Sequence, residues 1–271
     1  MPTTASSNKS PLAAKLKSGE SLANADYSNL DLYAIALDRA NLEQINFSQS
    51  ILTNADLVAA NLTRANLRGT DLRGANLTDA DLTGADLTGA YLSRADLRGA
   101  NLSDTNLQDT QFKVTIYDDK TVFPQGFYYQ SSGAIGPGAK LNGAYLNTAN
   151  LRGVDLTGAK LIGAYLSGAD LTGAILDDVS LSGANLQKAI ATGASFRNAR
   201  LGNTELAGVD FRAADLTGAI LEHIQNIAGA DFSMVRGLSA EARSAILNFP
   251  ASDLTTWNAY TRCNTRDSLM K

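Results

Sequence analysis

The residues that could do chemistry are few, and they stand far apart in the chain. The 271 residues include one histidine, His223, and one cysteine, Cys263, so paired histidines, an internal disulfide and a cysteine-rich zinc site are excluded. A cysteine nucleophile would need His223 beside Cys263 and a third group to orient the histidine. The adjacent acids Asp118-Asp119 and Asp177-Asp178 suit solvated turns better than a metal site. We therefore expect no catalytic residue, no cofactor and no metal, and predict that the protein is not an enzyme.

The elements that carry these residues repeat every five positions. Leucine occupies 16 of the 19 positions stepped by five from Leu22 to Phe112, and 14 of the 17 from Leu141 to Leu221. Alanine stands two residues before the central residue in 24 of these 36 units, and glycine stands two residues after it in 15. A typical unit is Ala85-Asp86-Leu87-Thr88-Gly89. Such a fixed register over two long runs indicates a repeat architecture.

A period of five belongs neither to an α-helix nor to a long strand. The alanine and leucine of a unit are two residues apart, so an extended backbone points both to one side and the Asp or Asn between them outward. The other two residues must turn the chain, which suits glycine. We therefore predict short extended segments joined by tight corners around a narrow Ala/Leu interior, with neighbouring coils paired backbone to backbone.

The motif resembles the pentapeptide repeat family over about residues 20–114 and 139–234. This resemblance implies an all-β solenoid, a right-handed quadrilateral β-helix with four pentapeptides in each coil. Applied to 36 units, it implies about nine coils in two runs, interrupted by a loop, with short α-helical caps at both ends. The phrases Phe123-Pro124-Gln125-Gly126-Phe127 and Trp257-Asn258-Ala259-Tyr260-Thr261-Arg262 are similar to cyanobacterial and chloroplast members.

The chain is predicted to have five segments. These are an N-terminal helical cap at 1–19, a first repeat run at 20–114, an interrupting loop at 115–138, a second run at 139–234, and a C-terminal helical cap and tail at 235–271. The caps are expected because an open coil exposes unpaired backbone groups. Residues 10–19 have the N-cap, proline and closing glycine of a short helix. Ser239 is expected to begin a second helix, and a further turn or helix from Asp253 to carry Trp257 and Tyr260.

The interruption leaves two interpretations open. The separation of Phe112 from Leu141 is one residue short of a whole number of pentapeptide steps. The stretch between them is rich in aromatic residues, which argues against simple disorder. Either this loop packs on one face of the helix and lets the winding resume, or it is a recognition loop that presents Tyr128 and Tyr129 to a partner.

The outer surface is expected to form columns, because residues four pentapeptides apart stack on one another in such a coil. One column of the second run holds Lys140, Lys160 and Arg200, and the column of the next face holds Tyr145 and Tyr165. Tyrosine and arginine are enriched among residues that dominate binding energies, so these five residues are a candidate protein-binding edge. The alternative is that outward positions tolerate any polar side chain and that tyrosine suits strands.

Two functions compete. The first is a non-catalytic rigid scaffold or protein-protein interaction module whose partner is left open. The second, taken from the resemblance, is a DNA-mimicking protein that binds topoisomerase (gyrase) and dimerises through its C-terminal helix. Mimicry needs a continuous acidic surface. Here the net charge is −4, and residues 20–114 carry −6 but are interrupted by five arginines: Arg64, Arg68, Arg73, Arg94 and Arg98.

Location and partners follow from composition. The mean hydropathy is −0.11 and no apolar run approaches the length of a membrane span, so no transmembrane segment is expected. The absence of a secretory signal predicts a cytoplasmic protein. The mild negative charge predicts no direct binding of nucleic acid. A homodimer would form through the tail at 253–271.

Overall fold

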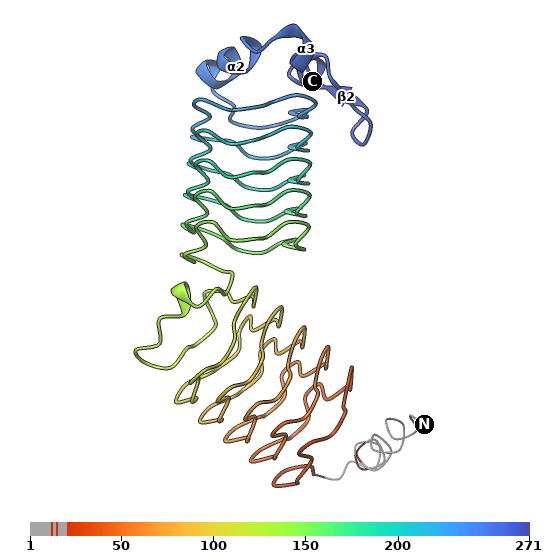
Figure 1. The fold of residues 1–271 in the computed structure, drawn as a ribbon, viewed down its shortest axis with the longest axis vertical. Helices are drawn as coiled ribbons and strands as arrows, with labels where there is room; N and C mark the ends of the chain where they lie inside the picture. The colour runs from red at the N-terminus through yellow and green to blue at the C-terminus, as the bar shows by residue number, and fades with distance from the viewer. Residues whose placement is uncertain (1–11, 13–14, 16–20) are drawn as a thin grey trace. The chain divides into compact units, whose positions relative to one another are not determined.

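A computed structural model describes residues 12, 15 and 21–271, and most of these residues wind in stacked coils (Figure 1). The chain divides into two compact units: unit 1 ends at Ile135, and unit 2 runs from Gly136 to Lys271. The predicted N-terminal cap at 1–19 lies outside the described residues except for Leu12 and Lys15, of which Leu12 is fully buried.

Backbone pairing between coils builds both units. Isolated parallel bridges join residues that are four pentapeptides apart, as in Asp81 with Asn101, and a bridge recurs at every pentapeptide along the chain. Each turn of the chain therefore has four bridged faces. The predicted β-helix with four pentapeptides in a coil is confirmed by this pattern.

A single pentapeptide shows how the sequence produces this geometry. Leu82 N donates to Asn101 O of the next coil at 2.7 Å, and Ala85 N closes the corner by donating to Leu82 O at 2.9 Å. Leu82 is fully buried and Ala85 is 1% exposed, so both face the interior. Between two such inward residues, the outward Asp81 accepts a hydrogen bond from Thr83 N on its Oδ1 at 2.9 Å. The outward acid thus bonds a backbone group of the corner that follows it.

The corner residue takes a left-handed backbone whether or not it is glycine. Gly84 has φ of 68°, and Arg94 at the same position of another unit has φ of 63°. Only some corners demand glycine for space. At Gly237 a Cβ would lie 2.4 Å from Thr217 Cα, which no side chain can tolerate.

Part of the interruption continues the β-helical winding of unit 1. Val122 bridges to Asn101 and Ile135 bridges to Ile116, so most of the predicted 115–138 loop belongs to the first unit. The 3₁₀ helix η1 (Tyr129–Ser131) lies within it. Four threonines stand where alanine is usual and donate their hydroxyls to leucine carbonyls of the coil before: Thr105 to Leu82 (3.0 Å), Thr110 to Leu87 (2.8 Å), Thr115 to Leu92 (2.7 Å) and Thr121 to Leu97 (2.9 Å).

The C-terminal segment of unit 2 is partly helical. Helix α2 (Ala240–Leu247) begins as predicted, with the Ser239 side chain accepting from Ala242 N. The second prediction is confirmed in part: helix α3 (Ala251–Leu254) is one short turn that includes Asp253, and Tyr260 lies in a turn. Trp257 lies instead on a hairpin of β1 (Trp257–Asn258) and β2 (Cys263–Asn264). The hairpin replaces a helix because Asn258 Oδ1 accepts from Tyr260 N and Thr261 N, which turns the chain.

Side chains of helix α4 (Thr265–Ser268) bond two backbone groups of the last coil that a further coil would otherwise have bonded. Thr265 Oγ1 donates to Ile227 O at 2.9 Å, and Ser268 Oγ accepts from Phe232 N at 3.0 Å. Thr265 and Ser268 are both buried, so no water competes for these groups. Side-chain hydroxyls thus take the place of the missing backbone.

We expect Ser268→Ala to lower the free energy of unfolding by about 1–3 kcal/mol, because Phe232 N would be buried without an acceptor. Urea unfolding measures this loss. Ser252→Ala, at an exposed position, is the control and should change stability by less than about 0.5 kcal/mol. Equal effects of the two substitutions would contradict the sealing role of Ser268.

The interior of unit 2 contains one position where alanine replaces the central leucine. Ala191 N donates to Asp210 O, which places Ala191 against Phe211 of the next coil, as the predicted register of four pentapeptides requires. Both residues are fully buried. The Phe211 ring also contacts Phe196 and Phe232, at centroid distances of 5.5 and 5.3 Å. The large ring and the small alanine are therefore neighbours in one packed layer.

Ala191→Leu is expected to destabilise the protein by about 1–3 kcal/mol, because the added carbons have no space beside the Phe211 ring. Thermal unfolding of the variant gives the measurement. The double variant Ala191→Leu/Phe211→Leu should recover most of the loss, since it restores two leucines in adjacent coils. A double variant no more stable than Ala191→Leu would show that the two side chains do not share this space.

Candidate protein-binding surface

The basic column of unit 2 is assembled by consecutive backbone bridges. Lys140 pairs with Lys160, and the column continues through Ser180 to Arg200. All three cations lie on the outer surface, and within the described part of the chain none has an ion-pair partner. Their charge is therefore available to a partner.

The tyrosine column lies on the next face. Tyr145 bridges to Tyr165, and their rings stack 4.8 Å apart at an interplanar angle of 2°. The distance equals one rung of the β-helix, so the coil spacing itself sets the stack. Tyr145 is 71% exposed and Tyr165 is 43% exposed. We call Lys140, Lys160, Arg200, Tyr145 and Tyr165 together the Lys–Tyr edge.

The two other predicted residues lie in unit 1 and differ from each other. Tyr129 stacks on Phe123, with ring centroids 4.5 Å apart, inside a cluster that also includes Phe112, Tyr117 and Phe127. Tyr128 lies outside this cluster and is 85% exposed. Packing therefore occupies Tyr129, and Tyr128 is the side chain of the pair that a partner would meet.

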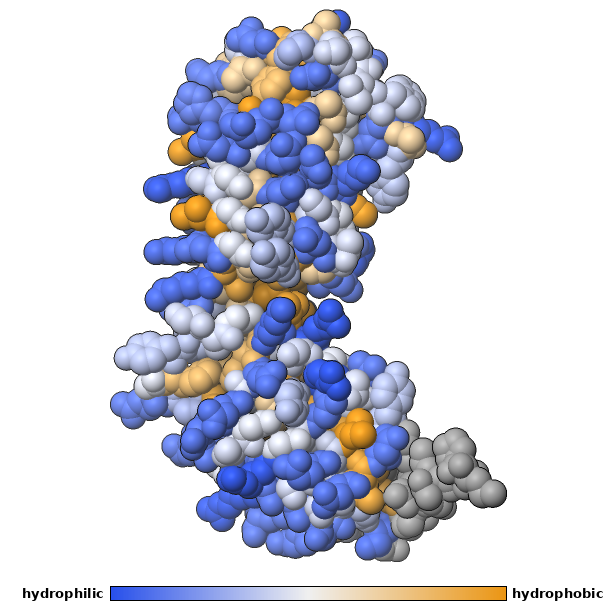
Figure 2. Space-filling model, in the orientation of Figure 1, coloured by the Kyte–Doolittle hydropathy of each residue, from blue (hydrophilic) through white to orange (hydrophobic). Residues whose placement is uncertain are grey.

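Part of the remaining surface charge is neutralised locally. Figure 2 shows a mainly hydrophilic outer surface with scattered apolar side chains. In the described residues, ion pairs form at Arg68–Asp86, Arg73–Asp71, Arg98–Asp96, Arg152–Asp170, Arg197–Asp215 and Arg212–Asp210. The cations of the Lys–Tyr edge form none of these ion pairs.

The carboxylate of Asp215 is buried, and its pKa is strongly lowered. Its Oδ1 accepts from Thr217 Oγ1 at 2.6 Å and from Thr217 N at 3.0 Å, and its Oδ2 accepts from Arg197 Nε at 2.8 Å. The hydrogen bonds from Thr217, with the charge of Arg197, lower the pKa of Asp215 from 3.8 to about 2. The ionised form is therefore the one that stabilises the fold.

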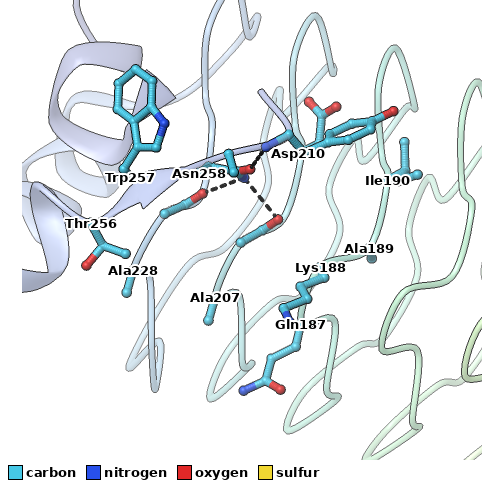
Figure 3. Close-up of a pocket in the computed structure, with 14 residues that line it drawn as sticks. Gln187, Lys188, Ala189, Ile190, Ala207, Asp210, Ala228, Thr256, Trp257 and Asn258 are labelled. Carbon is cyan, nitrogen blue, oxygen red and sulfur yellow. Dashed lines mark hydrogen bonds between the residues drawn. The ribbon is translucent and has the colours of Figure 1, made fainter. Parts of the chain in front are cut away.

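A groove that sequence analysis missed lies between the hairpin and the coil corners, with a volume of about 750 Å³. Figure 3 shows Asn258 reaching from β1 toward the coils, where its Nδ2 donates to Gly208 O at 3.3 Å and Gly229 O at 2.9 Å. The Arg212 guanidinium lies 5.9 Å from the centroid of the Tyr260 ring. The one feature of the sequence that could have indicated this groove is Asn258, because asparagine favours turns such as the turn of a hairpin.

No catalytic arrangement is assembled from the residues considered above. Cys263 is buried, and its Sγ lies 3.3 Å from Lys271 Nζ, while His223 occupies a corner with φ of 51°. Among the described residues, no group of three or more His, Cys, Asp and Glu side chains could hold a metal ion. Nor does any described helix have the length and apolar character needed to cross a membrane.

Comparison with known proteins identifies the repeat. Pentapeptide repeats match the chain in eight copies, over residues 40–79, 80–113, 138–168, 164–203 and 194–225. The chain belongs to the pentapeptide repeat family. The matched stretches leave out the interruption, where the aromatic cluster lies. No curated protein sequence matches this pentapeptide repeat protein.

Solved structures of other pentapeptide repeat proteins resemble parts of the chain. The protein Rfr23 from the cyanobacterium Cyanothece 51142 is 45% identical over 35% of this chain and 64% of its own, with a TM-score of 0.34. HetL from the cyanobacterium Nostoc sp. strain PCC 7120, involved in heterocyst differentiation regulation, is 28% identical over 81% and 94%, with a TM-score of 0.30. QnrB1, a plasmid-mediated fluoroquinolone resistance protein, is 18% identical over 84% and 100%, with a TM-score of 0.34.

The pKa of Asp215 predicts a pH-dependent stability. Since the pKa is lower in the folded state, the stabilisation is complete above about pH 4 and is lost as the pH falls toward 2. Asp215→Asn should therefore cost about 1–2 kcal/mol at pH 7, and this difference should shrink below pH 4. Urea unfolding at a series of pH values measures it. Asp155→Asn, three rungs away in the same column and without an arginine partner, is the control and should show a smaller loss.

Proposed function

We propose that this pentapeptide repeat protein is a non-catalytic interaction module that binds a protein partner along the Lys–Tyr edge. The observation that carries the proposal is the exposed stack of Tyr145 and Tyr165 beside cations that have no internal partner among the described residues. Stacked rings held by backbone bridges offer a large apolar area at little entropic loss, since the stack is formed before binding. Tyr128 is proposed as a second contact on unit 1.

The partner's chemistry follows from the edge. Lys140 and Lys160 are one rung apart, so an acidic surface with closely spaced carboxylates complements them. The tyrosine rings beside them suit aromatic or aliphatic side chains of that partner. Such a complex would weaken as salt rises, because the cations are exposed.

The DNA-mimic alternative receives less support. A mimic of phosphates needs ionised side chains free to face the enzyme. In unit 1, however, Asp71, Asp86 and Asp96 are each paired with an arginine. The cytoplasmic location and a homodimer through residues 253–271 stay as predictions.

The proposal is tested by affinity capture from a lysate of the native host, with wild type as one bait and the variant Lys140→Ser/Lys160→Ser/Tyr145→Ser/Tyr165→Ser as another. We expect the variant to lose a protein that wild type retains, because both charge and aromatic area are removed. Mass spectrometry identifies the proteins. Circular dichroism and thermal unfolding establish that each bait is folded.

The matched control is Asp155→Ser/Ile175→Ser, which changes two stacked outward residues on another face of unit 2. This control should retain the same protein as wild type. If both variants lose it, or if the Lys–Tyr edge variant retains it, the edge is not the binding surface. Recovery of gyrase would instead favour the DNA-mimic alternative.

A further inference from the structure

One corner of unit 1 brings basic and hydroxyl side chains together on successive rungs. Asn54 N donates to Arg73 O at 2.9 Å, Gly74 N to Ser93 O at 3.0 Å, and Arg94 N to Lys113 O at 3.2 Å, so these corners stack directly on one another. They enclose a concavity of about 340 Å³, lined by Thr53, Asn54, Arg73, Gly74, Ser93 and Arg94.

The charge of this corner is opposite to that of its surroundings. Residues 20–114 carry a net charge of −6. At the corner, Arg73 is paired with Asp71, whereas neither Arg94 nor Lys113 has a partner among the described residues. Three cations against one carboxylate leave a net charge of +2. The acid on the flanking face, Asp96, is already occupied by Arg98.

The donors are arranged for a group with several oxygens. Arg73 donates Nε and Nη2 to Asp71, which leaves its Nη1 free on one rung. The Arg94 guanidinium and the Ser93 hydroxyl have no partner among the described residues, and the backbone that carries them lies one rung away, at a spacing of about 4.8 Å. Beside Gly74, the space that a Cβ would take is occupied by Asn54 Oδ1, which would lie 2.4 Å from that Cβ. A carboxylate has two oxygens and would satisfy one guanidinium, as Asp71 does for Arg73.

We propose that this corner binds a phosphate monoester, the group carried by phosphoserine. The ester offers three oxygens to the two guanidiniums and the hydroxyl, and its charge of about −2 matches the +2 of the corner. Arg94 is the principal contact, Arg73 is held in place by Asp71, and Lys113 adds charge from the following rung. The site lies in unit 1 and is independent of the Lys–Tyr edge, so the failure of either proposal leaves the other standing.

The test is isothermal titration calorimetry of the full chain at constant ionic strength with O-phospho-L-serine. Wild type is expected to show saturable one-site binding. Arg94→Gly should weaken it at least tenfold. Glycine is the commonest residue at this corner position and is relaxed at the φ of 63° found there, so the variant is expected to fold. Thermal unfolding checks this.

Arg64→Gly is the matched control. Arg64 is also an exposed corner arginine, with φ of 58° and no ion pair among the described residues, but it has no second arginine beside it. This variant should bind like wild type. Equal weakening by Arg64→Gly and Arg94→Gly, or no saturable binding by wild type, would overturn the proposal.

Two further titrants separate the possible ligands. L-aspartate should bind at least tenfold more weakly than phosphoserine, because it lacks the third oxygen and the second charge. Inorganic phosphate should bind no more tightly than phosphoserine if the concavity accepts an ester. Equal binding of aspartate, or binding of inorganic phosphate without phosphoserine, would exclude a phosphate monoester as the ligand.

Discussion

Backbone pairing between successive coils, at an interval of four pentapeptides over most of the repeat, is the constraint on which the rest of this protein depends. Leu82 N reaches Asn101 O only if the corners between them turn the chain by equal amounts, and the inward Ala85 is small enough to let the walls approach. Once that interval is set, every outward residue lies against its counterpart one coil away. The surface is then a set of columns, and the rings of Tyr145 and Tyr165 stack because the bridged backbone holds them one rung apart.

The same constraint makes the ends and interruptions of the repeat chemically distinct. A coil without a neighbour presents backbone groups that need partners. In unit 2 the hydroxyls of Thr265 and Ser268 satisfy two of them. In unit 1 threonines replace alanine before the aromatic cluster, and their hydroxyls bond the carbonyls of the preceding coil. These departures from the consensus thus lie next to changes in the winding.

Charge on a solenoid of this kind divides into two classes. Outward acids such as Asp81 accept corner N–H groups, and several also hold an arginine, so their charge serves the fold. Other cations, Lys140 and Arg94 among them, form no ion pair among the described residues. We propose that this second class carries the binding properties of this mildly acidic pentapeptide repeat protein.

The sequence alone was enough to determine the β-helix, its columns and the start of α2, because each depends on a local pattern repeated in a fixed register or on a single N-cap such as Ser239. It also placed Tyr128 and Tyr129 in an interruption without separating their roles. Only the tertiary structure decided that Tyr129 packs on Phe123, that Trp257 lies on a hairpin, and that Arg94 and Arg73 share a concavity. The first two features depend on packing outside the repeat, and the third depends on the direction of side chains at a corner. Neither cause produces a periodic pattern in the sequence.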